Sequence, residues 1–247
     1  MPPHDRNQAA FNRPDVVAAY REMSGLTPCE LGIFGDHIPA GSQVLDLGVG
    51  AGRTVPWLID RAGRYVGIDL APAMVAAARQ DHPGIDIRVG DAADLGEHDT
   101  ASFDAVVFSY NGIDYLHPDG VRRRGLAEVH RVLRPGGSFV FSTHNPRAFV
   151  ADVQAIGGRP ARRHAVALAM TAARGVRRAG SRASWRGEGW VLDRARGGLV
   201  THAATPARVI AELEANGFEH ADTRPGNLPR PAGTWRTPWY YYAFTAS

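Results

Sequence analysis

A chain of 247 residues with 44% hydrophobic side chains has enough apolar mass for a full core, and one main domain is expected. The one cysteine, Cys29, excludes an internal disulfide framework and a multi-thiolate metal site, and it fits a reducing compartment. The net charge of +3 comes from arginine without any lysine, so it is a weak sign of an anionic macromolecular partner.

The first residues, MPPHDRNQAAFNRPDVV, carry early charges and no apolar core of signal-peptide length. No segment approaches the ~18 uninterrupted apolar residues of a membrane-spanning helix. We therefore expect a soluble, cytoplasmic protein without a membrane partner, as a monomer or a homodimer. No cluster of metal ligands is visible, so no metal requirement is expected.

Two helices are predicted within residues 1–40, ahead of the first strand. PDVVAAYREMS (14–24) begins with proline, and TPCELGIFGDHIP (27–39) offers Thr27 as an N-cap. Short apolar strands then alternate with helices such as PWLIDRAG, APAMVAAARQ and GVRRRGLAEVHRVL. The predicted strands are residues 43–48, 64–69, 85–91, 103–110 and 137–144. This alternation indicates a parallel sheet covered on both faces, with ligands at the carboxyl ends of its strands.

The alternation stops after residue 144. Residues 147–200 look inserted, with a predicted basic helix around 161–178 and the strand-like GWVLD (189–193). TPARVIAELEANGF (205–218) is predicted as a helix with Thr205 as N-cap and Gly217 as its stop. FEHADTRP and TPWYYYAFT read as two more strands. The whole chain, 1–247, is interpreted as one doubly wound α/β domain of seven strands with an insertion after the fifth.

VLDLGVGAGRT (44–54) places three glycines behind an apolar strand, where backbone amides and a helix N-terminus can approach a ligand. A phosphate-binding P-loop needs lysine where Arg53 stands, in a loop of another length. A dinucleotide fingerprint needs a last glycine where Arg53 or Val55 stands. Asp69, about 20 residues on, would suit a ribose in any Rossmann-like fold.

DLGVGAG resembles motif I of the class I S-adenosylmethionine-dependent methyltransferases. FDAVVFSYNGIDYL and EVHRVLRPGGSFVFSTHN resemble later parts of the same family, so the resemblance covers about residues 14–146, and 205–247 by topology. It implies that S-adenosylmethionine is the cofactor, S-adenosylhomocysteine the product, and the last strand antiparallel. The implied cofactor-binding residues are Tyr20, Asp46, Gly48, Gly50, Gly52, Asp69, Leu70, Asp91, Ala92 and Ser109.

In the family, the glycine turn lies under the methionine part of the cofactor, and the acid of motif I, here Asp46, orients the amino group. The resemblance gives Asp69 both ribose hydroxyls, which one carboxylate can accept together. It implies that Leu70 packs on the adenine, with Asp91 on its amino group and Ala92 supplying a backbone amide. Tyr20 resembles a tyrosine that closes over the cofactor carboxylate.

Methyl transfer needs a nucleophile held in line with the S–CH3 bond and, for a hydroxyl, a proton acceptor. His144 directly follows the fifth strand and is the first choice for that base, with Tyr110 and Asp114 as further catalytic candidates. Two alternatives stay open: His144 only bonds a neighbouring loop, and Asp114 caps the helix that follows it. The candidates for acceptor binding are Asn111, His117, Trp185, Trp190 and His202.

Residues 147–200 are expected to form a lid over the acceptor. The arginines of its basic helix either form a solvated face or bind an anionic acceptor. Trp185, Trp190, Trp235 and Trp239 either wall an apolar pocket or belong to the core.

The sequence thus predicts methyl transfer to oxygen or nitrogen of a small molecule, with no nucleic-acid partner. The alternatives are an RNA or protein methyltransferase that uses the basic insert, a non-catalytic cofactor-binding accessory protein, and a nicotinamide reductase.

Overall fold

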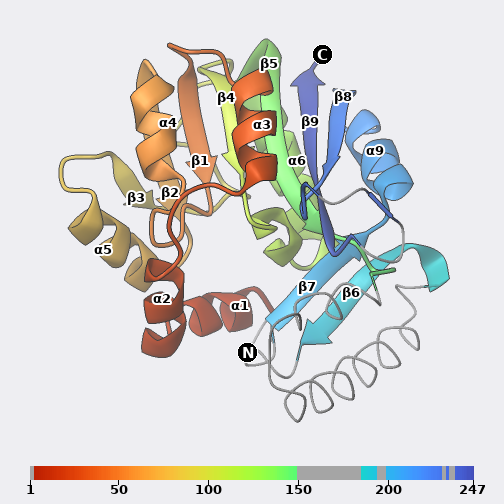
Figure 1. Cartoon of the computed structure of the whole chain (residues 1–247), viewed down its shortest axis with the longest axis horizontal. Helices are drawn as coiled ribbons and strands as arrows, with labels where there is room; N and C mark the ends of the chain where they lie inside the picture. The colour runs from red at the N-terminus through yellow and green to blue at the C-terminus, as the bar shows by residue number, and fades with distance from the viewer. Residues whose placement is uncertain (1–2, 149–184, 194–198, 230–231, 234–236) are drawn as a thin grey trace.

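The computed structural model describes residues 3–148, 185–193, 199–229, 232–233 and 237–247. Its centre is a seven-stranded sheet in the order β3-β2-β1-β4-β5-β9-β8 (Figure 1). The strands are β1 Gln43–Leu47, β2 Arg64–Asp69, β3 Ile87–Val89, β4 Phe103–Phe108, β5 Leu133–His144, β8 Phe218–Pro225 and β9 Trp239–Ala246. Only β9 runs against its neighbours β5 and β8. The predicted doubly wound sheet with an antiparallel last strand is therefore confirmed.

Helices cover both faces of the sheet because successive strand residues point to opposite sides. On one face Leu45 and Leu47 of β1 join a core with α6 (Asp119–Val132) and α9 (Pro206–Glu214). On the other face Val44 joins a core with α3 (Pro28–His37), α4 (Val55–Arg61) and α5 (Pro72–Asp81). The carboxyl ends of the parallel strands are left free of these helices, at the lower edge in Figure 1.

Three helices precede β1, where the sequence predicted two. α2 (Pro14–Arg21) and α3 match the prediction, and Thr27 caps α3 in a capping box with Glu30. The missed helix is α1, Pro3–Phe11, whose sequence PHDRNQAAF is mostly polar and lacks an apolar stripe. Together α1 and α2 lie at the carboxyl ends of the strands (Figure 1).

A separate hairpin of β6 (Glu188–Asp193) and β7 (Leu199–Ala204) follows the main sheet. The sequence predicted β6 and missed β7. β7 packs on α1, on β5 and on the short 3-10 helix η1, Gly112–Tyr115. The predicted basic helix at 161–178, most of the expected lid, and Trp235 lie outside the described residues.

The last helix, α9, begins after Thr205 as predicted, although the Thr205 side chain makes no capping bond. Gly217 follows the helix with a φ of 86°, a left-handed conformation that favours glycine. Among the residues that the structure describes, no helix is long and apolar enough to cross a membrane.

Candidate cofactor and active site

The glycine turn after β1 is built from left-handed residues. Gly48, Gly50 and Gly52 have φ angles of 62°, 56° and 91°. A Cβ atom on Gly48 would lie 2.8 Å from the Phe108 ring, and one on Gly52 would lie 2.6 Å from His82. Any other residue at Gly48 or Gly52 would therefore strain the left-handed backbone, and its Cβ atom would also contact a neighbouring side chain too closely.

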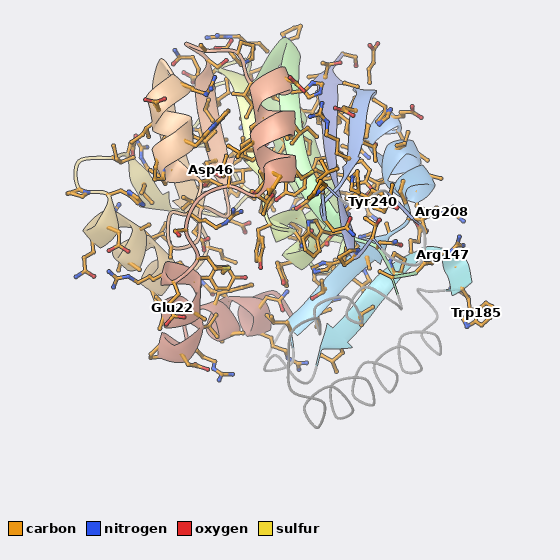
Figure 2. All side chains as sticks on the ribbon, viewed as in Figure 1. Glu22, Asp46, Arg147, Trp185, Arg208 and Tyr240 are labelled. Carbon is orange, nitrogen blue, oxygen red and sulfur yellow. The ribbon has the colours of Figure 1, made fainter. Side chains whose placement is uncertain are left out.

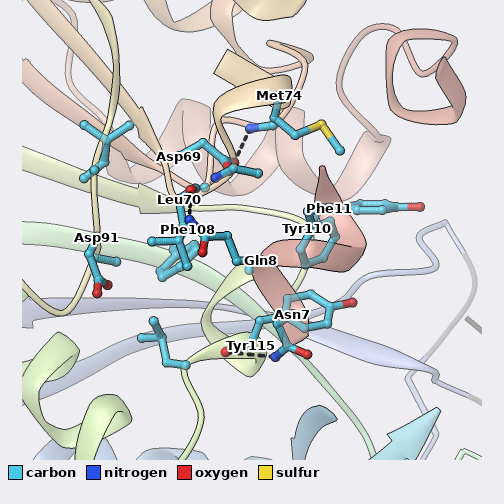
Figure 3. A pocket seen from close by; sticks show the side chains of 18 of the residues that line it. Asn7, Gln8, Phe11, Asp69, Leu70, Met74, Asp91, Phe108, Tyr110 and Tyr115 are labelled. Atoms are coloured by element: carbon cyan, nitrogen blue, oxygen red, sulfur yellow. Dashed lines mark hydrogen bonds between the residues drawn. The ribbon is translucent and has the colours of Figure 1, made fainter. Parts of the chain in front are cut away.

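A cavity opens beside this turn, at the carboxyl ends of β1, β2, β3 and β4 (Figure 3). The sequence predicted a ligand site at this edge of the sheet. The cavity is lined by every predicted cofactor residue except Asp46 and Gly52, namely Tyr20, Gly48, Gly50, Asp69, Leu70, Asp91, Ala92 and Ser109. Tyr110 lines it too, and the missed helix α1 adds Asn7, Gln8 and Phe11.

Asp69 lies at the end of β2 and binds two backbone amides. One carboxylate oxygen accepts from Gly50 N at 2.8 Å and the other from Ala71 N at 2.8 Å. Burial raises the pKa of Asp69, while these two amides oppose that rise. Because each carboxylate oxygen has two lone pairs, one on each stays available for ligand hydroxyls.

Asp46 is 1% exposed and does not line the cavity. Its carboxylate accepts from Thr54 Oγ1 at 2.6 Å and from Tyr65 OH at 3.0 Å. Burial raises the pKa of Asp46 to about 6. The Asp46 carboxylate therefore links Thr54, at the far end of the glycine turn, to Tyr65 of β2.

Sequence reasoning missed a buried polar cluster behind the cavity. Glu30 of α3 is fully buried, and its Oε1 accepts from Arg53 Nη2 at 2.5 Å, Ser109 Oγ at 2.6 Å and Tyr241 OH at 2.6 Å. Burial by itself would raise the pKa of Glu30, but these partners, Arg53 first, lower it to about 2. Arg53 also lies over the Tyr110 ring, 5.2 Å from its centroid. These partners are far apart in the sequence, and no local pattern reveals them.

At the ends of β4 and β5, Asp114 and His144 form a close pair. Asp114 is fully buried and accepts from His144 Nδ1, from His144 N and from Thr143 Oγ1 at 2.8, 2.8 and 2.5 Å. The other ring nitrogen, Nε2, lies 3.4 Å from Asn111 Nδ2. The alternative that Asp114 caps the following helix is wrong, because α6 begins at Asp119 with Pro118 as its N-cap.

A buried arginine supports this pair from α6. Arg122 is 2% exposed, and one of its terminal nitrogens lies 3.9 Å from Asp114 Oδ1. It donates to Ile113 O at 3.0 Å and makes a two-pronged ion pair with Glu212 of α9. A cation therefore sits behind the Asp114 carboxylate on the side away from His144.

Three of the five predicted acceptor residues pack edge to face beside η1. The ring of Trp190 lies 4.3 Å from that of His117 and 5.0 Å from that of His202. Burial lowers the pKa of His202 to about 4, so this imidazole is neutral at pH 7. Its Nδ1, like Asn111 Oδ1, is buried and has no hydrogen-bond partner within the described part of the chain.

Two other tryptophans that the sequence offered for the acceptor pocket, Trp185 and Trp239, lie away from the Trp190 ring. Trp185 is 79% exposed and projects from the edge of the molecule, so it is not part of this cluster (Figure 2). Trp239 packs against the core on the α3 face of the sheet, in agreement with the alternative of a core role.

Comparison with known proteins identifies the domain. A family model described as a methyltransferase domain matches residues 44–137, from β1 to the start of β5. The chain is 40% identical over 113 residues to a probable S-adenosylmethionine-dependent methyltransferase of Mycolicibacterium smegmatis, covering 46% of this chain and 42% of the relative. It is 31% identical over 157 residues to a ubiquinone biosynthesis O-methyltransferase of Xanthomonas oryzae, covering 60% and 64%. The chain thus spans about half the length of the curated relatives it matches.

Solved structures agree in fold. The N1-methyltransferase of 1,6-didemethyltoxoflavin from Burkholderia thailandensis has a TM-score of 0.64 at 18% identity, covering 100% of this chain and 91% of that one. A methyltransferase from Methanosarcina mazei has a TM-score of 0.61 at 19% identity, covering 90% and 98%. The cavity at the glycine turn fits S-adenosylmethionine, the cofactor of the matched family. The matching domain, the strand order and the cavity together support a class I S-adenosylmethionine-dependent methyltransferase.

Proposed function

We propose that the protein transfers a methyl group from S-adenosylmethionine to a small molecule, with a hydroxyl oxygen as the favoured acceptor atom. The observation that carries this proposal is the Asp114–His144 pair at the edge of the sheet where the cavity lies. A buried carboxylate that fixes a half-exposed histidine is an arrangement for accepting a proton. A hydroxyl acceptor needs such a base, whereas a neutral amine does not need it before attack.

For the cofactor, we propose that Asp69 binds the ribose hydroxyls and that the glycine turn faces the methionine part. Leu70, Asp91 and Ala92 would contact the adenine, since all three line the same cavity as Asp69. Tyr20 supports the methionine end, because its ring lies 3.5 Å from where a Cβ of Gly50 would stand. The Ser109 hydroxyl is already donated to Glu30, so we propose that Ser109 contributes only its oxygen lone pairs or its backbone.

When bound, S-adenosylmethionine supplies a methyl group on a positively charged sulfur. The chain's own residues must hold the acceptor oxygen in line with that bond and remove its proton. Asp114 accepts the hydrogen on Nδ1 of His144, which leaves a lone pair on Nε2 that faces the Asn111 amide at 3.4 Å and that the acceptor hydroxyl would take over. We propose that Nε2 takes the acceptor's proton as the C–O bond forms, and that Asp114 stabilises the resulting imidazolium.

The relatives favour small molecules. The name of the Xanthomonas relative specifies O-methylation in ubiquinone biosynthesis, and a Mycobacterium tuberculosis relative, 35% identical over 158 residues and covering 62% of this chain and 54% of that one, is a phthiotriol/phenolphthiotriol dimycocerosates methyltransferase. The basic insert that would favour RNA or protein lies outside the described residues. A non-catalytic accessory protein would have no use for the Asp114–His144 pair.

The proposal is tested by incubating the protein with labelled S-adenosylmethionine and an extract of its source organism. The extract is then divided into small molecules, nucleic acid and protein. We expect the label in the small-molecule fraction, at a mass that identifies the acceptor. Label in RNA or protein would replace the small-molecule proposal, and no transfer at all would support the accessory-protein alternative.

Replacing Asp69 by alanine is expected to weaken S-adenosylhomocysteine binding by about 1.5–3 kcal/mol, the range for hydrogen bonds to a charged group. Calorimetric titration measures the change. Asp60→Ala, on the exposed side of α4, is the matched control and should bind as the native protein does. Equal affinity of the Asp69→Ala and native proteins would rule out the ribose assignment.

A further inference from the structure

Asn7 of α1 joins this helix to the acceptor-side hairpin. The side chain is 3% exposed, and its amide pairs with both backbone groups of Val200 in β7. Nδ2 donates to Val200 O at 2.9 Å, and Oδ1 accepts from Val200 N at 3.0 Å. Nδ2 also donates to Tyr115 O of η1 at 3.2 Å (Figure 3). The Asn7 side-chain amide thus links α1 to β7 and to η1, which are far apart in the sequence.

The same helix lies against the proposed cofactor site. Gln8 Nε2 donates to the carbonyl of Leu70, the residue proposed to contact the adenine, at 3.0 Å. Phe11 lies edge-on to Tyr20, with 6.0 Å between ring centroids, and lines the cavity beside Gln8 and Asn7. A ligand in the cavity therefore lies directly beneath α1.

The hairpin is the element that carries the acceptor-side residues. Trp190 of β6 and His202 of β7 pack edge to face, and β7 packs on η1, which contains Asp114. Any shift of β7 relative to η1 would therefore move Trp190 and His202 relative to Asp114.

We propose that Asn7 is a positioning residue that couples cofactor binding to the placement of the β6–β7 hairpin. This inference rests on the proposed function. A helix of nine residues is marginal on its own, so α1 depends on what lies beneath it. A bound cofactor adds contacts only when α1 is closed, and closure brings Asn7 to Val200. The β6–β7 hairpin, which carries Trp190 and His202, then takes its place beside the acceptor only after the cofactor has bound. The cofactor therefore binds first and the acceptor second.

Hydrogen–deuterium exchange of the full chain, with and without saturating S-adenosylhomocysteine, tests this coupling. The diagnostic amides are those of β6, Glu188–Asp193, since Asn7 touches β7 and not β6. In the native protein the ligand should slow exchange both in residues 69–71 and in β6. We expect about 2- to 12-fold slowing in β6, the range for one net hydrogen bond.

In Asn7→Ala the ligand should still slow exchange at residues 69–71, while the slowing in β6 disappears. Asn12→Ala is the matched control, because Asn12, the residue after α1, accepts from Ala73 N of α5 and makes no hydrogen bond to the described residues of the hairpin. It should keep both effects. Asn7→Asp keeps only the acceptor oxygen and should give a reduced effect in β6, and it replaces the alanine variant if that variant fails to fold.

The outcomes separate this inference from the proposed function. Ligand-dependent slowing of β6 that persists in Asn7→Ala would overturn the coupling. So would native protein that responds at residues 69–71 but not in β6, and the cofactor assignment would then stand. Native protein with no response at residues 69–71 would contradict the cofactor assignment and the coupling together.

Discussion

Replacing His144 by alanine is expected to lower the rate of methyl transfer by about 10²–10⁴-fold, the range for loss of a general base. The affinity for S-adenosylhomocysteine should stay native, because His144 does not line the cavity that contains Asp69. Single-turnover transfer to the acceptor found in the labelled extract measures the rate. Calorimetry on the same preparation measures the affinity.

His220→Ala is the matched control for this variant. His220 is an exposed histidine of β8 that makes a hydrogen bond of 2.8 Å with Thr223 and an edge-on contact with the Phe244 ring, far from the cavity, and its loss should leave the rate unchanged. Undiminished transfer in His144→Ala would remove His144 from the catalytic residues. It would also favour an acceptor that has no proton to lose before attack, such as a neutral amine.

Replacing Glu30 by alanine should lower the free energy of unfolding by about 3–5 kcal/mol, the cost of leaving a buried charge without its partner. Arg53, whose side chain is 12% exposed, would lose its counter-ion, and the cap of α3 would lose its acceptor for Thr27 N. Urea unfolding measures the difference. Asp86→Ala breaks the exposed Asp86–Arg88 pair and should cost about 0–1 kcal/mol.

The same carboxyl predicts a dependence on pH. The pKa of Glu30 falls from an ordinary value of 4.5 to about 2 in the folded protein, so the folded state favours its ionised form. This stabilisation is fully present above pH 4.5 and is lost as the pH falls through about 2. Glu30→Gln should therefore lose less stability between pH 7 and pH 3 than the native protein. An equal loss in both proteins would contradict the assigned pKa.

The main sheet was predictable because its signals are local. Short apolar runs separated by helical stretches fix the strands, and the glycine turn marks where β1 ends. α1 was missed because its residues are polar and its order comes from contacts with distant segments. β7 was missed because its polar and small residues, LVTHAA, become a strand only by pairing with β6.

The candidate site divides in the same way. The predicted cofactor residues are attached to strand ends, and parallel strands bring those ends to one edge. Their roles stay predictions. Asp114 was predicted as a catalytic candidate with a helix cap as the open alternative, because a cap is a local feature, whereas its partners Thr143 and His144 come about 30 residues later. Glu30 lies in α3 and Arg53 follows β1, and only the fold brings the two side chains together.

The Phe108 ring at the end of β4 limits which residues can replace its two glycine neighbours, Gly48 and Gly112. A Cβ atom on Gly48 would stand 2.8 Å from this ring, and one on Gly112 of η1 would stand 2.2 Å from it. The ring is therefore wedged between the turn after β1 and the helix that holds Asp114. In evolutionary terms positions 108 and 112 form one unit of inheritance: a side chain gained at Gly112 becomes acceptable only in a lineage where position 108 has already become smaller. Gly48 stays glycine even then, because its φ of 62° is left-handed.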